Sequence, residues 1–108
     1  MTVSEFAKEY SLSVLAMPDG DREITGCYIG DLLSWVMGRA KADDAWVTIM
    51  SNQNIVAVAS LADVACVVLA EGVVPEKDVI DLASQKGVNL LSCELDAFSI
   101  AKLLGTRI

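Results

Sequence analysis

Apolar and polar positions along the chain fall into blocks whose spacing changes from one block to the next. Apolar side chains recur at the three- and four-residue spacing of one helix face in residues 32–40, in residues 75–87 and after Asp96. Short runs rich in β-branched residues are typical of strands, and these lie at residues 12–16, 24–29, 46–50, 66–70 and 88–91. The pattern predicts strands and helices in alternation.

Signals at the ends support several of these helices. Thr2 and Glu5 have the spacing of a capping box, which predicts a helix over residues 3–10. Pro75 is placed to begin a helix that ends at Lys86 and Gly87. Periodicity does not separate strand from helix in residues 55–62, but their alanines and the need for a crossover before the next strand favour a helix.

The same pattern predicts which side chains face the core. On the helix at residues 32–40 the apolar stripe consists of Leu32, Leu33, Val36 and Met37, and Trp35 falls outside it. In the helix that Asp96 opens, we expect Phe98, Ala101 and Leu104 to pack inward.

Strand, helix, strand, helix, strand, helix is the order in the second half of the chain. Right-handed crossovers between parallel strands place helices on both faces of such a sheet. The sequence therefore predicts an α/β fold, with three α/β/α layers around a central, mostly parallel sheet. A chain of 108 residues with 54% hydrophobic residues is expected to form a single domain over residues 1–108.

Charge and hydropathy narrow the classes of partner. The net charge of −7 and the scattered lysines and arginines argue against nucleic acid and against an anionic membrane surface. No signal peptide is evident, and no apolar run reaches the roughly 20 residues of a membrane span. We expect a cytoplasmic protein.

Three cysteines and no histidine make up the thiol and imidazole inventory. Cys27, Cys66 and Cys93 are far apart, whereas zinc and iron–sulfur sites need clustered ligands, so no metal or other cofactor is expected. Cys66 and Cys93 lie in apolar runs and are predicted to be core residues. Asp43 and Asp44 are interpreted as solvated charges and not as a magnesium pair.

Motifs for catalysis are missing. The chain has no Walker phosphate loop and no glycine fingerprint for dinucleotides. Without histidine, the usual general base and the Ser-His or Cys-His nucleophile pairs are unavailable. We predict that the chain is not an enzyme and has no catalytic residues.

Polar, glycine-containing segments are the candidates for binding. Ligands of parallel sheets collect beyond the carboxyl ends of strands, where the pattern places Gly30 with Asp31 and the segment at residues 51–54. Arg22 could contact an anion or pair with Asp21. The candidate ligand-binding residues are Asp21, Arg22, Thr25, Gly26, Gly30, Asp31, Ser51, Asn52 and Asn54. The alternative is structural: Asp31 and Asn52 cap helices, and the glycines form turns.

Residues 21–26, Asp-Arg-Glu-Ile-Thr-Gly, followed by Tyr-Ile-Gly-Asp-Leu-Leu-Ser at 28–34, resemble the signature of the DRTGG domain family. The resemblance extends through residues 46–49, 54–59 and 97–98 and is strongest to short stand-alone members, which are similar to the N-terminal domain of HPr kinase/phosphorylase. It implies an α/β domain that associates in pairs and serves as a regulatory or scaffolding unit, without the separate kinase domain. Two departures are Cys27, where the family often has a small residue, and Asn52, where short members often carry a histidine.

Two main functional hypotheses follow, beside a third class in which the chain is a degenerate enzyme subunit that is active only when a partner completes it. The first is a non-catalytic regulatory or adaptor domain, a homodimer that acts through a protein partner. The second is a small-molecule sensor that binds a nucleotide or another anion at residues 26–31 and 51–54. The sequence names neither the ligand nor the partner.

Overall fold

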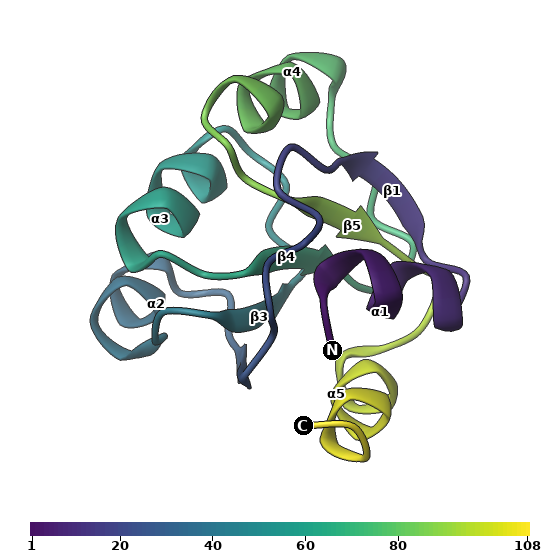
Figure 1. Cartoon of the computed structure of the whole chain (residues 1–108). Coiled ribbons are helices and arrows are strands. Elements are labelled where there is room, and N and C mark those ends of the chain that lie inside the picture. The colour runs from purple at the N-terminus through teal and green to yellow at the C-terminus, as the bar shows by residue number, and fades with distance from the viewer.

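A five-stranded sheet with helices on both faces forms the fold in the computed structural model, which describes residues 1–108 (Figure 1). The strand order is β1-β5-β4-β3-β2, in which β2 to β5 run parallel and β1 is antiparallel to β5. The strands are β1 (Ser13–Ala16), β2 (Gly26–Ile29), β3 (Asp44–Thr48), β4 (Cys66–Leu69) and β5 (Leu90–Ser92). The predicted α/β class with a mostly parallel sheet is confirmed.

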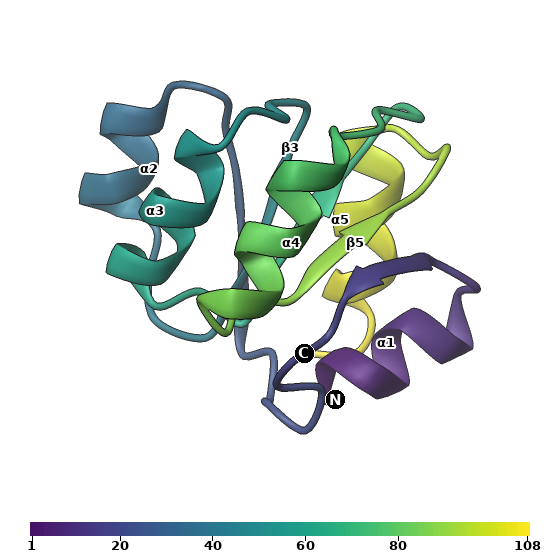
Figure 2. The same cartoon turned by 90° about the horizontal axis from the view of Figure 1, so that it is seen from above.

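Five helices complete the three layers. One face of the sheet carries α1 (Val3–Glu9) and α5 (Ala97–Gly105), and the other carries α2 (Leu33–Arg39), α3 (Asn54–Ala62) and α4 (Lys77–Gln85) (Figure 2). The ambiguous run at residues 55–62 is a helix, as expected. None of the helices combines the length and the apolar composition that a membrane span needs.

The core has two halves because strand side chains alternate between the two faces of the sheet. Val47 of β3 packs with Phe6 of α1 and Ile100 of α5 in one half. Trp46, the preceding residue of β3, packs with Ile55 of α3 in the other half. The central strands β3 and β4 are buried on both faces, which explains their near-continuous apolar sequences.

Helix ends follow the sequence signals in two of three cases. The Thr2 hydroxyl accepts a hydrogen bond from the Glu5 amide at 3.1 Å, and the Thr2 amide donates to the Glu5 carboxylate at 2.8 Å, so the capping box is confirmed. Asp96 caps α5 by accepting from the Ser99 amide at 2.7 Å. Helix α4 begins at Lys77 and not at Pro75, because Glu76 keeps an extended conformation with ψ 159°.

Two predictions of the inward-facing stripes were wrong. Phe98 is 73% exposed, because α5 faces the sheet through Ile100 and Leu104, and Phe98 lies on nearly the opposite side of the helix from Ile100. On α2 only Val36 is fully buried. Leu32 precedes the helix in an extended conformation, and both it and Met37 are exposed.

Candidate functional site

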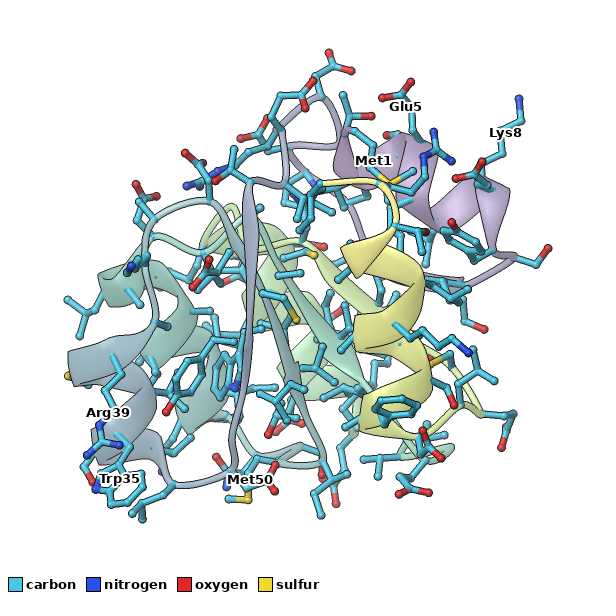
Figure 3. The ribbon with its side chains drawn as sticks, turned by 90° about the horizontal axis from the view of Figure 1, so that it is seen from below. Met1, Glu5, Lys8, Trp35, Arg39 and Met50 are labelled. Carbon is cyan, nitrogen blue, oxygen red and sulfur yellow. The ribbon has the colours of Figure 1, made fainter.

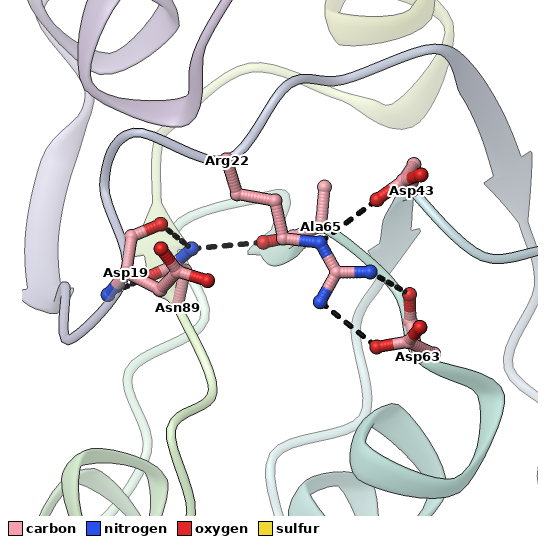
Figure 4. Close-up of polar contacts among 6 residues, drawn as sticks. All are labelled: Asp19, Arg22, Asp43, Asp63, Ala65 and Asn89. Atoms are coloured by element: carbon pink, nitrogen blue, oxygen red, sulfur yellow. Dashed lines mark hydrogen bonds and ion pairs between the residues drawn. The ribbon is translucent and has the colours of Figure 1, made fainter.

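Arg22 lies at the amino end of the parallel strands, where two aspartates hold it (Figure 4). Its Nε donates to Asp43 Oδ1 at 2.9 Å, and its Nη1 lies 2.9 Å from Asp63 Oδ1. Its Nη2 also donates to the carbonyl oxygen of Asp63. Asp43 and Asp63 occupy connections next to β3 and β4 and have φ angles of 70° and 59°. The guanidinium therefore joins the segment before β2 to two turns, and its partner is not Asp21.

Asn89, just before β5, forms a second polar junction at the same end of the sheet (Figure 4). Its side chain is buried and donates to the carbonyl oxygens of Asp19 at 2.7 Å and Ala65 at 2.9 Å. Its Oδ1 accepts from the Asp19 amide at 3.0 Å. The residue fastens the turn after β1 to the sheet. No sequence pattern above assigned it a role, although a single asparagine among apolar residues is a signal of such an anchor.

Thr25 and Gly26 lie beside this end of β3. The Thr25 amide donates to the carbonyl oxygen of Asp43 at 3.0 Å. A Cβ at Gly26 would collide with the carboxylate of Asp44, which is buried and accepts from the Lys41 amide at 2.8 Å. Gly26 is thus required by close packing. The interpretation of Asp43 and Asp44 as solvated charges was wrong, because Asp44 is buried and Asp43 forms an ion pair with Arg22.

Asp31 lies at the opposite, carboxyl end of the strands. Its Oδ1 accepts from the Thr48 hydroxyl at 2.7 Å and from the Ile49 amide at 3.0 Å. Asp31 therefore joins the loop after β2 to the end of β3, and the cap of α2 is Leu32, without a side-chain hydrogen bond. The engaged Ile49 amide also explains why β3 ends at Thr48 and not at Met50. The helix-capping alternative for Asp31 was wrong.

Gly30 precedes Asp31 and is fixed by two contacts. Its amide donates to the carbonyl oxygen of Val47 at 3.2 Å, and its own carbonyl oxygen accepts from the buried indole of Trp46 at 2.8 Å. A side chain at Gly30 would meet the Tyr28 ring, at 2.8 Å from its nearest atom. Gly30 and Asp31 together therefore fasten the loop after β2 to β3.

Ser51 and Asn52 line a hollow of about 430 Å³ at the same end of the sheet, between the starts of α3 and α4. Asn52 accepts from the Asn54 amide at 2.9 Å, and Gln53 Nε2 donates to Asp78 at 2.7 Å. The remaining wall consists of Val74, Glu76, Asp78 and Val79. The polar side of the hollow thus carries two carboxylates and no cation.

The candidate residues form two groups and not a single site. Arg22, Thr25 and Gly26 belong to the amino end of the sheet, and the exposed Asp21 lies in the segment just before β2. Gly30, Asp31 and the 51–54 segment belong to the carboxyl end. The cation expected to contact an anion is therefore separated from the polar hollow by the length of the strands.

The three thiols differ in burial. Burial raises the pKa of Cys66 to about 12, and this residue is in the core, as predicted. Cys93 is only partly buried and packs against the core. Loss of solvation, and then the Asp44 carboxylate, raise the pKa of Cys27 to about 11, although its side chain lies at the surface. These thiols therefore stay protonated at neutral pH, and no group of three or more acidic or thiol side chains is placed to hold a metal ion.

Trp35 and Arg39 form a stacked pair on the outer side of α2 (Figure 3). The guanidinium carbon of Arg39 lies 3.7 Å from the centre of a Trp35 ring, and Trp35 is 52% exposed. Trp35 was expected outside the apolar stripe, but Arg39 was missed. The four-residue spacing of an aromatic and an arginine on one helix was the available signal.

Comparison with known proteins supplies the family. The family model described as "DRTGG domain" matches residues 29–106. The chain belongs to the DRTGG domain family. The matched region begins after residues 21–26. The family assignment of this DRTGG domain therefore does not rest on those residues, which include Arg22.

A solved structure agrees with the fold of this DRTGG domain. It contains the CBS and DRTGG domains of the regulatory region of Clostridium perfringens pyrophosphatase, complexed with its activator diadenosine tetraphosphate. The TM-score is 0.74 at 14% sequence identity, over 95% of this chain and 45% of that chain. The chain therefore spans less than half the length of this structural relative. No curated protein matches its sequence.

Proposed function

We propose that this DRTGG domain is a non-catalytic regulatory domain that works by binding protein, first as a homodimer and then through a further protein partner. The observation that carries the proposal is that large apolar side chains are exposed on β2, on the helices α2 and α5 and in the loops beside them. These side chains include Ile29, Leu32, Trp35, Ile49 and Phe98, with exposures of 49%, 56%, 52%, 49% and 73%. Burial of such side chains against another protein removes apolar surface from water, which favours association.

The chemistry of the other polar groups supports a non-catalytic role. Arg22, the only cation among the candidate residues, is engaged by Asp43 and Asp63. The thiols are protonated at neutral pH, and the chain has no histidine to act as a general base. The structural relative is a regulatory region of an enzyme, which agrees with a domain that modulates another protein.

A sensor for a nucleotide is the second candidate function. It is favoured by the nucleotide activator that is complexed with the structural relative and by the hollow next to Ser51 and Asn52. Glu76 and Asp78 on the wall of this hollow repel a polyphosphate, so the nucleobase end of a ligand would fit there better than its phosphates. The observations therefore support the sensor less than the protein-binding domain.

Two measurements test the proposal: the mass of the native protein, and its melting temperature with and without added nucleotide. We expect a dimer whose mass matches the protein alone and whose melting temperature does not change on addition of diadenosine tetraphosphate or ATP. A monomer at all concentrations would refute the dimer. Stabilisation by a nucleotide, lost in an Asn52→Ala variant and kept in a Leu61→Ala surface control, would replace the proposal with the sensor.

A further inference from the structure

The sheet has two edge strands, β1 and β2, which differ in how well they are protected from pairing with another chain. Edge strand β1 pairs with β5 through an irregular register between Val14 and Ala16. Edge strand β2 pairs with β3 in unbroken register and contains glycine, cysteine, tyrosine and isoleucine, with no charge and no proline. Bulges, charges and prolines are among the features that keep edge strands from pairing with another chain. The β2 edge has none of them.

The free backbone groups of β2 can be assigned from its bonds to β3. The Gly30 amide donates to the carbonyl oxygen of Val47 at 3.2 Å, in continuation of the register that pairs Ile29 with Val47, and residues of a parallel strand alternate between its two neighbours. Gly26, Tyr28 and Gly30 therefore direct their backbone groups to β3, whereas Cys27 and Ile29 turn theirs outward. Figure 3 looks onto this edge, with the ribbon of β2 running between α2 and α5.

One face of β2 is also uncovered. Cys27 and Ile29 pair with Ala45 and Val47, so they lie on the face that α1 and α5 cover. Helix α5 seals Ala45 and Val47 completely but leaves Cys27 exposed and Ile29 49% exposed. The strand thus presents an apolar face beside its unpaired edge.

We propose that a second copy of this chain occupies this edge, with the two β2 strands antiparallel and the two-fold axis at Tyr28. The outward amide and carbonyl of Cys27 then pair with the carbonyl and amide of the partner's Ile29, which lies directly opposite, and the same pair forms again on the other side of the axis. On the α5 face, two cysteines and two isoleucines form one apolar cluster. This inference rests on the proposed homodimer and specifies its interface.

Charges at the two ends of β2 are complementary in this arrangement. Arg39 and Lys41 line a hollow of about 360 Å³ along residues 25–28, at the amino end of the strand, together with the buried Asp44. Antiparallel pairing brings the partner's Asp31 opposite Thr25, into this hollow. Asp31 Oδ1 is engaged by Thr48 and Ile49, which leaves Oδ2 for Lys41 of the other copy. The two-fold symmetry repeats the Lys41–Asp31 contact, and β2 itself carries no charged side chain.

Disulfide trapping tests the register. Oxidation of an Ile29→Cys variant should yield a covalent dimer through Cys27, because these positions face each other across the axis. Val14→Cys, at the other edge and 52% exposed, is the matched control and should not cross-link above the wild-type level. Both variants retain Cys93, so any background from that thiol is shared.

Charge substitution tests the same interface without thiol chemistry. Ile29→Lys should raise the dimer dissociation constant at least about tenfold with an unchanged melting temperature of the monomer, whereas Val14→Lys should leave it unchanged. If wild type is a dimer but Ile29→Cys does not cross-link and Ile29→Lys stays dimeric, the β2 interface is wrong and the homodimer stands. If wild type is a monomer, the proposed homodimer fails as well.

Discussion

Arg22 Nε and Asp43 Oδ1 lie 2.9 Å apart, at the end of the sheet opposite the polar hollow. Asp63 completes the arrangement from the turn after α3. The residue that the sequence offers as an anion contact is thus part of a junction between three connections. The Arg22 side chain is 22% exposed, so the ion pairs are partly shielded from water.

Replacement of Arg22 should therefore lower stability. We expect Arg22→Ala to reduce the free energy of unfolding by about 1–2 kcal/mol, because two carboxylates lose their partner. Arg22→Lys should recover only part of this loss, since an ammonium cannot reproduce the forked contacts. Chemical denaturation measures both variants. An unchanged unfolding free energy in Arg22→Ala would show that the junction is not stabilising.

Asp31 should matter for the same structural reason. Asp31→Ala leaves the Ile49 amide and the buried Thr48 hydroxyl without their acceptor, and we expect a loss of about 1–2 kcal/mol. Asp31→Asn keeps an acceptor oxygen and should lose less. Thermal unfolding of the two variants beside wild type makes the comparison; equal stability of all three would contradict this role of the loop.

Asn89 is expected to be the most sensitive of the polar residues. Its buried side chain makes three hydrogen bonds to backbone groups of Asp19 and Ala65. Asn89→Ala leaves those groups unpaired and should cost about 2–3 kcal/mol. Asn89→Asp removes the donors and keeps an acceptor, so it should also be destabilised. Amide exchange of Asp19, whose protection should fall in both variants, is the measurement.

Acid should weaken the fold through its helix caps. The Thr2 amide and hydroxyl lower the pKa of Glu5, and the Ser99 amide lowers the pKa of Asp96. A carboxyl whose pKa is lower in the folded state stabilises the fold above its unfolded pKa, and this contribution is lost as pH falls through the folded pKa. The ordinary values are 4.5 and 3.8, so the melting temperature should fall below about pH 4.5.

An Asp96→Asn variant isolates one of these two groups. Asparagine also caps helices but does not titrate in this range, so the variant should lose less stability than wild type on acidification. Melting curves at a series of pH values test this. A drop as steep as that of wild type would assign the acid sensitivity to other groups.

The fold could be predicted from the sequence because its signals are local and consistent. Apolar periodicity, the Thr2 capping box and the Asp96 cap all agree with the alternation of strands and helices. Phe98 was misplaced because helical spacing gives the relative angles of side chains but not which side the sheet occupies. That choice depends on tertiary packing.

The candidate residues were harder to interpret because their partners are remote in sequence. Arg22 meets Asp63 across 41 positions, and Asn89 meets Asp19 across 70. Short-range patterns offer no means of finding such pairs. Asp31 looked like a helix cap because it precedes an apolar helix, but its carboxylate turns to β3, where Thr48 and Ile49 supply two donors.

Native mass spectrometry of the unmodified protein tests the central claim most directly. We predict a species at twice the 11.5 kDa chain mass, with no added ligand mass and with dissociation on dilution. A dimer is the species expected if the domain binds a second copy of itself through its exposed apolar surface. A single chain at every concentration would contradict the account, and a retained mass of nucleotide size would favour the sensor instead.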